Sequence, residues 1–261
     1  MTLHAAELQA HPTAAADPQA QARARLAWAL LALVLVFAMA GLATGTQGFS
    51  PAALWADLQG DQAALILGQI RAPRTLGAAL VGALLGLGGA LAQGLFRNPL
   101  ADPYLLGSAA GAGLAVVLVL AGAAVAGTTL SLATVAWLDR AGLLVAAFTG
   151  ALVGVALTLT LAQGAVHTLR LLLGGVVVSV LLGALSDLVT VASPDALRGK
   201  QAFMLGSTSF LGWQAVAVLA SGMVLLTAGA LRSARVLDAL TLGEDSAASL
   251  GVALPRMRLQ L

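Results

Sequence analysis

Long runs without a single Asp, Glu, Lys or Arg are the feature that most restricts how this 261-residue chain can fold. A helix that crosses a bilayer needs about 20 apolar residues, because each residue rises about 1.5 Å through a hydrocarbon core about 30 Å thick. A shorter charge-free run, 171–186, ends at Asp187. Runs of at least the spanning length lie at 26–56, 75–96, 103–138, 141–169 and 201–231.

These runs predict an all-α fold, a polytopic bundle of transmembrane helices. They are continuously apolar and longer than barrel strands, which disfavours a transmembrane β-barrel. Ahead of the spans, residues 1–25 are expected to form a flexible cytoplasmic tail. The segment 232–261 is expected to follow the transmembrane domain (26–231) on the cytoplasmic side. The six expected spans lie near 26–46, 75–96, 105–126, 141–163, 170–192 and 213–231.

The composition excludes several classes of protein. Hydrophobic residues make up 59% of the chain and charged residues 9%, whereas a soluble domain is about 25% charged. Too few charges are present to cover a solvated surface, so neither a soluble globule nor a disordered chain is expected. The absence of Cys excludes disulfides, thiolate metal sites and cysteine nucleophiles. The net charge of +2 gives no reason to expect a nucleic-acid partner, and the three His have no metal-ligand spacing.

The distribution of basic residues predicts a cytoplasmic N-terminus. In that orientation eight basic residues lie on the inner side and five on the outer side. Arg71 and Arg74 run against this rule, because they flank Pro73 at the outer mouth of the second span. Snorkelling at the interface explains them as well as a docking site for an acidic partner does, and the residues alone do not choose between the two.

Glycines spaced four residues apart predict close helix–helix contacts. Lipid supplies no hydrophobic drive between helices, so close backbone approach must supply packing energy. A role as hinges is the alternative. The pairs within the expected spans are Gly82 with Gly86, Gly107 with Gly111, and Gly150 with Gly154.

Three segments between the spans carry local signals. In 97–107 two prolines break the helix, so this stretch is either a cytoplasmic turn, which we favour, or part of a pathway lining. Ser50 before Pro51 predicts the start of a short interfacial helix that carries Trp55. Pro194 similarly predicts a helix start within the outer segment 193–213. After it, Ser207, Thr208 and Ser209 are expected to cap the next helix instead of lining a vestibule.

Asp187 lies inside the fifth apolar run, toward its outer end. A carboxylate within a span is expected to have a function, but this one could also reach the outer water, and both readings stay open. After the sixth span, Glu244 and Asp245 suit the N-terminus of a short helix, and Gly251 suits its end. That helix either contacts a cytoplasmic partner or is only a structured loop.

Taken in order, four motifs resemble the FecCD-type permease subunit of iron-siderophore, haem and cobalamin ABC importers. The resemblance covers about residues 25 to 261. The motifs are QIRAPRTL (69–76), GLFRNPLADPYLLGSAAGA (94–112), RLLLGGVVVSVLLGALSDL (170–188) and LGEDSAASLGVALPRMR (242–258).

This resemblance implies a multi-pass protein of the bacterial inner membrane that catalyses no covalent chemistry. It implies a second permease subunit, in a homodimer, together with a cytoplasmic ABC ATPase dimer and a periplasmic substrate-binding protein. The chain needs no cofactor of its own. It has no G-x-x-x-x-G-K-[ST] motif, so ATP must bind to the partner ATPase. Family members have ten spans, so a chain that ends at Leu261 is expected to be truncated after the sixth.

The same resemblance implies roles for individual residues. The outer arginines Arg71 and Arg74 would dock the binding protein through charge-assisted pairs. A cytoplasmic gate along the pathway would comprise Asn98, Leu100, His167 and Thr168. The segment that couples to the ATPase would comprise Glu244, Ala247, Ala248 and Gly251.

Two alternatives belong to other functional classes. An ion-coupled secondary transporter would use Asp187 as its coupling site and would need no ATPase. A truncated chain could also be a membrane scaffold that binds the ATPase without transporting cargo.

Overall fold

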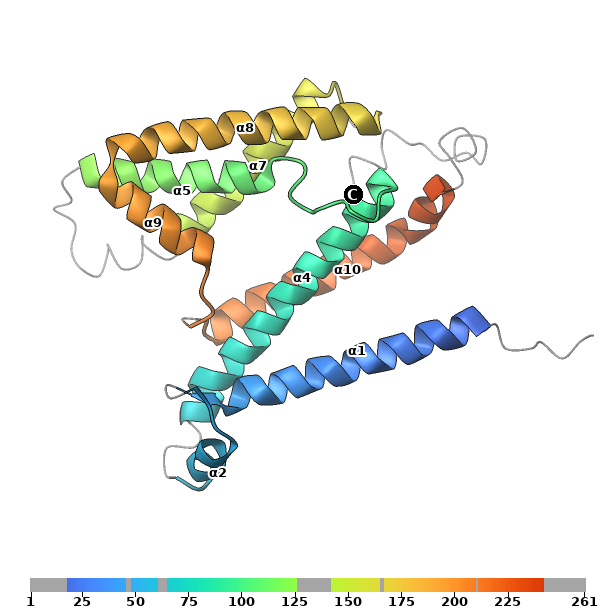
Figure 1. Cartoon of the computed structure of the whole chain (residues 1–261), viewed down its shortest axis with the longest axis vertical. Coiled ribbons are helices and arrows are strands. Elements are labelled where there is room, and N and C mark those ends of the chain that lie inside the picture. Colours follow the sequence, from blue (N-terminus) through green and yellow to red (C-terminus); the bar gives the residue numbers. More distant parts are fainter. Residues whose placement is uncertain are drawn as a thin grey trace, which may run out of the picture. The chain divides into compact units, whose positions relative to one another are not determined.

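The computed structural model describes residues 18–45, 48–60, 65–125, 142–164, 167–209 and 211–241. The chain forms two compact units, residues 1–79 and 80–261, which are described separately. Helices dominate both units (Figure 1).

The first unit begins with α1 (Pro18–Ala43), which starts inside the segment predicted to be a flexible tail. Arg23 and Arg25 therefore lie on the helix and not ahead of it. Proline is well tolerated in a first helical turn, and the Ala, Gln and Arg residues that follow favour helix. The other elements of this unit are β1 (Thr44–Gly45), β2 (Gly48–Phe49), α2 (Pro51–Gln59), η1 (Ile66–Arg71) and the start of α4 (Ala72–Phe96).

A two-residue antiparallel ladder, which the sequence did not predict, joins α1 to α2. Thr44 pairs with Phe49, and Gly45 pairs with Gly48. The predicted start of α2 is confirmed. Pro51 is its first residue, and the carbonyl oxygen of Ser50 accepts the N–H of Leu54 at 3.1 Å, which is the first helical hydrogen bond.

A π-helical segment leads without a break into α4. The N–H of Ala72 donates to the carbonyl oxygen of Leu67, five residues earlier. The cause is the buried Pro73, which has no N–H and whose ring would collide with the carbonyl group four residues before it. Wider turns avoid that collision. The second predicted span therefore starts at Ile66 and not near residue 75.

The second unit continues α4 and contains a compact group of helices (Figure 1). Within that group α5 packs against α7, α8 and α9, and α8 packs against α7 and α9. The unit comprises α4 from residue 80 onward, α5 (Ser108–Val125), α7 (Leu143–Leu161), α8 (Thr168–Ala192), α9 (Pro194–Leu205) and α10 (Trp213–Thr241).

Glycines form the contact between α5 and α7, as predicted. A Cβ on Gly150 would clash with the carbonyl oxygen of Gly111, and one on Gly111 would clash with that of Gly150. A Cβ on Gly154 would lie 2.5 Å from the carbonyl oxygen of Gly107. Gly107 itself lies in the turn before α5 and not inside a span.

The third predicted glycine pair lies on α4 and, unlike the glycines between α5 and α7, is not closely packed in the described residues. Around Gly82 and Gly86 an added Cβ would have open space within the described residues. The predicted helix contact at this pair is thus not seen in that part of the chain.

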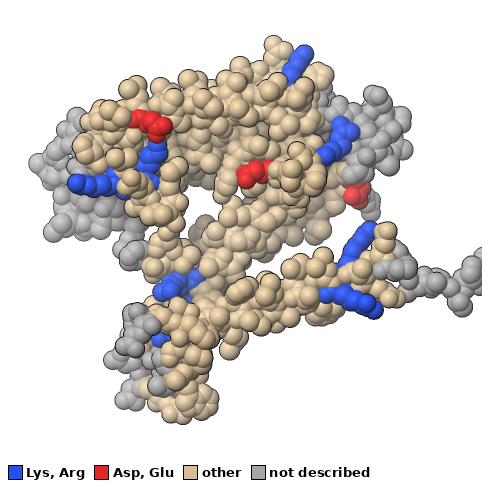
Figure 2. All heavy atoms as spheres, viewed as in Figure 1, with Lys and Arg blue, Asp and Glu red and all other residues tan. Residues whose placement is uncertain are grey.

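Each predicted span corresponds to a helix. Within the described residues five helices are long and apolar enough to cross a membrane: α1, the continuous η1–α4, α7, α8 and the first part of α10. The sixth, α5, is apolar but shorter in the part of the chain that the structure describes, where residues 103–107 form a turn before it. The predicted class, an all-α polytopic bundle, is confirmed. In Figure 2 the charged side chains gather near helix ends and leave broad uncharged areas between them.

One cluster of buried apolar side chains positions the elements discussed below. It joins the C-terminal end of α4, the following turn, the end of α7 and the start of α8. The end of α4, the end of α7 and the start of α8 therefore lie at one end of the second unit. The members of this buried cluster are Ala92, Leu95, Phe96, Ala101, Ala162 and Leu171.

The segment after α8 agrees with the prediction in part. Ser193 caps α9 through its Oγ, which accepts the N–H of Ala196 at 3.4 Å, and Pro194 is the first helical residue. The predicted capping of α10 by residues 207–209 is wrong. Ser207 Oγ instead accepts the N–H of Ser209, which forms a local turn, and the first bond of α10 runs from Val216 N–H to Gly212.

Candidate functional site

The turn after α4, residues 97–107, is held in a defined shape at its start, and we name it the α4–α5 turn. Arg97 has a positive φ of 49°. Its N–H donates to the carbonyl oxygen of Gly94 at 3.4 Å, and the N–H of Asn98 donates to that of Gln93 at 3.2 Å. These two bonds are the Schellman motif that ends many helices, with an arginine where glycine is usual.

Two polar side chains then stabilise the turn from within. Asn98 Oδ1 accepts the N–H of Leu100 at 2.9 Å, and Asp102 Oδ1 accepts the N–H of Tyr104 at 2.7 Å. Both are Asx turns, in which a short polar side chain replaces a backbone acceptor. Leu100 between them is 87% exposed. Asn98, predicted as a gate residue, thus shapes the turn, and Leu100 projects from it.

The second half of the α4–α5 turn lies against the backbones of α7 and α8. Thr158, which is fully buried on α7, donates its hydroxyl to the carbonyl oxygen of Leu106 at 2.9 Å. On α8 a Cβ at Gly175 would clash with the carbonyl oxygen of Leu105. Gly107 has a φ of 80°, which favours glycine. The turn is therefore fixed from Leu105 onward, whereas residues 97–100 are exposed.

His167 and Thr168, the other predicted gate residues, begin α8. His167 occupies the N-cap position with extended backbone, and its exposed side chain makes no capping hydrogen bond. Its carbonyl oxygen accepts the N–H of Leu171 at 3.1 Å. Leu171 belongs to the same buried cluster as Ala101 of the turn. The structure thus brings the elements that carry the four predicted gate residues to one end of the unit.

Arg71, one of the two predicted docking residues, has a role inside its own unit. Its Nη1 donates to the carbonyl oxygen of Leu42 at 2.9 Å, near the end of α1. Ser50 N–H and Thr44 Oγ1 satisfy the neighbouring carbonyl oxygens of Ala43 and Ala40, at 3.1 and 2.7 Å. Arg71 therefore helps to satisfy the last carbonyl groups of α1.

Arg74, the second predicted docking residue, lies about one turn further along α4 and is partly buried. The described hydrogen bonds to the last carbonyl groups of α1 come from Thr44, Ser50 and Arg71, and not from Arg74.

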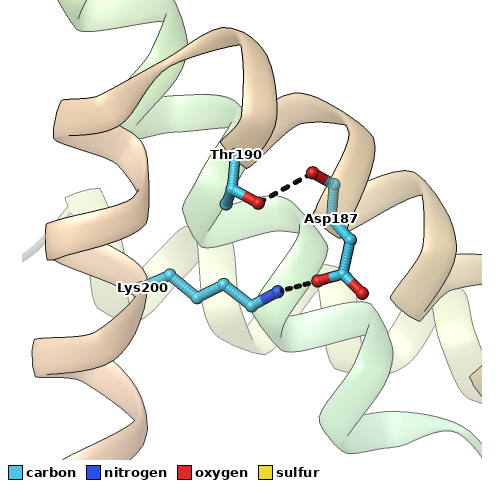
Figure 3. A network of polar contacts seen from close by, with 3 residues as sticks. All are labelled: Asp187, Thr190 and Lys200. Carbon is cyan, nitrogen blue, oxygen red and sulfur yellow. Dashed lines mark hydrogen bonds and ion pairs between the residues drawn. The ribbon is translucent and has the colours of Figure 1, made fainter.

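Asp187 forms an ion pair that joins α8 to α9 (Figure 3). Its Oδ1 lies 2.7 Å from Nζ of Lys200, the only lysine in the chain. The lysine side chain is 14% exposed and the carboxylate side chain 74%. One helical turn further on, Thr190 donates its hydroxyl to the carbonyl oxygen of Asp187 at 2.8 Å. Of the two sequence readings, the structure favours a carboxylate near the end of its span, exposed and paired.

The residues predicted to couple to the ATPase lie outside the described residues. They are Glu244, Ala247, Ala248 and Gly251.

Sequence reasoning missed three features of this region. Arg97 and Gln163 both adopt positive φ at the ends of α4 and α7, without the glycine that would signal such an end. The contact made by Thr158 could have been predicted from the sequence, because Thr158 continues the four-residue spacing of Gly150 and Gly154 on α7. The partner of Asp187 could also have been suspected, since Lys200 is the only lysine in the chain and lies only 13 positions further along it.

The comparisons with known proteins extend over most of the chain. The model of the FecCD transport family matches residues 31–261. The hemin transport system permease protein HmuU of Yersinia pestis is 34% identical over 234 residues, which are 89% of this chain and 68% of that protein. The ferric enterobactin transport system permease protein FepD of Escherichia coli is 38% identical over 192 residues, 72% of this chain and 54% of that protein.

One more relative and one solved structure are also similar to this chain. The cobalamin import system permease protein BtuC of Halobacterium salinarum is 36% identical over 200 residues, 76% of this chain and 51% of that protein. The chain thus spans about half the length of the enterobactin and cobalamin relatives. A solved structure, an inward-facing ABC transporter assigned to the metal-chelate type, superposes with a TM-score of 0.71 at 25% identity. The superposition covers 90% of this chain and 71% of that one.

Proposed function

Because this chain belongs to the FecCD transport family, we propose that it is a permease subunit of an ATP-driven importer for an iron chelate or a related cargo. The family resemblance inferred from the sequence motifs is confirmed by the match over residues 31–261. That match is the observation that carries the proposal. The cargo would be haem, a ferric siderophore or cobalamin, the three classes named among the relatives.

The proposed assembly places this multi-pass chain in the bacterial inner membrane with its N-terminus in the cytoplasm. A second copy of the permease completes the translocation pathway, a cytoplasmic ABC ATPase dimer supplies the energy, and a periplasmic binding protein delivers the cargo. ATP binds to the ATPase. In this assembly Glu244, Ala247, Ala248 and Gly251 contact the ATPase.

The geometry of the α4–α5 turn supports a gate at this point. A gate needs an element that is anchored at one end and exposed at its tip, and this turn meets both conditions. Asn98 stabilises the turn, Leu100 projects from it, and His167 and Thr168 lie at the start of a helix in the same cluster. In the proposed orientation all four lie at the cytoplasmic side of the pathway.

The pairing of Asp187 favours this importer over an ion-coupled transporter. A coupling carboxylate is expected to face the interior of the bundle or a water-filled path within the membrane. Asp187 instead lies near the C-terminal end of α8, is largely exposed and is bound to Lys200. Its charge is balanced without a transported ion.

The direct test is uptake by the reconstituted complex. The full chain, with its partner ATPase and binding protein, is placed in proteoliposomes and offered haem, a ferric siderophore or cyanocobalamin. We expect ATP to drive uptake of one of the three. Uptake driven by an ion gradient without ATP, or no uptake of any of them, would overturn the proposal.

The docking role is tested best at Arg74, because replacing Arg71 would also remove the hydrogen bond to Leu42. Arg74→Glu is expected to weaken binding of the periplasmic protein, and the loss should be larger at low salt, where surface charges are screened least. Arg25→Glu, on the opposite face of the membrane in this orientation, is the matched control. Equal affinities for the two variants would remove Arg74 from the docking site.

A further inference from the structure

Helix α10 reaches α4 immediately before the α4–α5 turn. It continues without a break to Thr241, past the predicted end of the span at residue 231. Near its C-terminal end, Leu237 lies against Gly94 of α4. A Cβ on Gly94 would be 3.2 Å from Cδ2 of Leu237 and 3.6 Å from Cδ1. The first of these distances is tighter than ordinary van der Waals contact, so Leu237 can lie this close because residue 94 has no side chain.

Gly94 takes part in the hydrogen bonds that end α4. Its carbonyl oxygen accepts the N–H of Arg97, one of the two bonds that end the helix and begin the turn. Ala92, Leu95 and Phe96 bury their side chains in the cluster shared with α7 and α8. Since an α-helix has about 3.6 residues per turn, Gly94 lies on the face opposite these three. The last turn of α4 is thus held between that cluster and Leu237.

We propose that the contact between Leu237 and Gly94 transmits movement of α10 to the α4–α5 turn. This inference rests on the proposed function, in which the segment that follows α10 meets the ATPase. Residue 94 has no side chain that could move aside, and packed helices deform little. A displacement of Leu237 would therefore displace the backbone of α4 directly. Leu237 and Gly94 are therefore positioning residues, which act through the turn and touch no cargo.

The anchorage of the turn decides where this displacement appears. From Leu105 onward, the turn is fixed by the hydroxyl of Thr158 and by the close approach of Gly175. Movement of the end of α4 must then be taken up between Arg97 and Tyr104. This is the stretch that carries Asn98 and the exposed side chain of Leu100. The contact would thus convert a shift of α10 into a shift of the proposed gate.

The test uses the full complex and a single reporter. The chain has no Cys, so Leu100→Cys gives one attachment site per chain for a spin label that reports movement, and uptake is measured on the unlabelled chain that keeps Leu100. Leu237→Ala removes the contact and needs no new space. We expect it to leave ATP hydrolysis in place. We expect it to reduce both the ATP-dependent change of the label and the cargo moved per ATP by about fivefold or more, the lower limit of a usual coupling effect.

Matched variants separate transmission from general damage. Leu231→Ala makes the same change on α10 at a side chain that is 70% exposed, and should leave the coupling unchanged. Gly94→Val should uncouple by pushing α10 away, whereas Gly89→Val, on the same helix with open space in the described part of the chain, should not. Combining Gly94→Val with Leu237→Ala should restore coupling, because the smaller side chain makes room. A purely structural role predicts no such rescue.

The outcomes distinguish this inference from the proposed function. If the parent protein imports cargo and its label responds to ATP, and both persist in Leu237→Ala, the contact transmits nothing and only the inference fails. If the parent protein shows neither ATP-driven uptake nor a response of the label, both fail.

Discussion

The two ends of α8 are held in different ways. Near its start, Gly175 meets the carbonyl oxygen of Leu105, and Gly174 lies close to that of Thr158. Near its other end, Asp187 is joined to Lys200 of α9 through two side chains, one of them largely exposed. Backbone contacts of the first kind cannot be relaxed by a change of rotamer, whereas an ion pair of the second kind can be. The end that carries the α4–α5 turn is therefore fixed, and the attachment of α9 is adjustable.

The largest expected effect comes from placing a methyl group at the fixed end. Gly175→Ala would push α8 away from the backbone of Leu105 and should cost about 3 kcal/mol, the upper range for overpacking. Thermal unfolding of the purified protein in detergent measures the loss.

The control for this change lies on the same helix. Gly183→Ala meets open space in the described residues, and alanine is the better helix former by up to about 1 kcal/mol. This variant should unfold at the same temperature as the parent or a higher one. If Gly175→Ala melted like Gly183→Ala, the backbone contact would not be what fixes this end.

A smaller effect is expected from the hydrogen bond that secures the turn. Thr158→Val keeps the shape of a fully buried side chain but removes the donor to the carbonyl oxygen of Leu106. The loss should be about 1 kcal/mol, the usual size for such bonds between helices in membranes. Thr160→Val is the comparison, because the Thr160 hydroxyl bonds within its own helix and is exposed. Equal melting temperatures for the two would mean that the hydroxyl of Thr158 does not stabilise the turn.

The sequence predicts the helices well, because their cause is local and strong. A charge within the hydrocarbon is costly, so a charge-free run marks the central part of each predicted span. The η1–α4 helix and α8 extend beyond their runs. Helix starts at Pro51 and Pro194 were also predictable, since a serine cap followed by proline is chemistry of adjacent residues. The start of α1 was missed because its first polar residues look like a tail and nevertheless favour helix.

The candidate site was less accessible to sequence reasoning, because its contacts join distant residues. Arg71 binds Leu42, 29 positions away, and Thr158 binds Leu106, 52 positions away. No local pattern encodes either pair. The end of α4 at Arg97 carries no glycine, so the positive φ there has no signature in the sequence. The family motifs located the α4–α5 turn as a region but did not say that Asn98 would stabilise it from within.

The smallest expected effect lies at the adjustable end. An ion pair with a largely exposed carboxylate is screened by water and is worth about 1 kcal/mol, so Asp187→Asn and Lys200→Gln should each lower the unfolding temperature slightly. The change should nearly vanish at about 1 M salt, where the screening length is about 3 Å. Helix α9 should stay in place, because Ala196 is fully buried and Gly199 packs tightly against Leu120.

A local measurement sharpens the contrast between the two ends. A spin label at Met204→Cys, an exposed position on α9, should become more mobile when the pair is removed, although global unfolding hardly changes. ATP-driven uptake should persist in Asp187→Asn, because the carboxylate carries no ion in the proposed mechanism. A loss of stability as large as that of Gly175→Ala would make the two ends of α8 equivalent. Abolished uptake in a stable Asp187→Asn protein would instead restore the ion-coupled alternative, because only coupling through that carboxylate requires its charge.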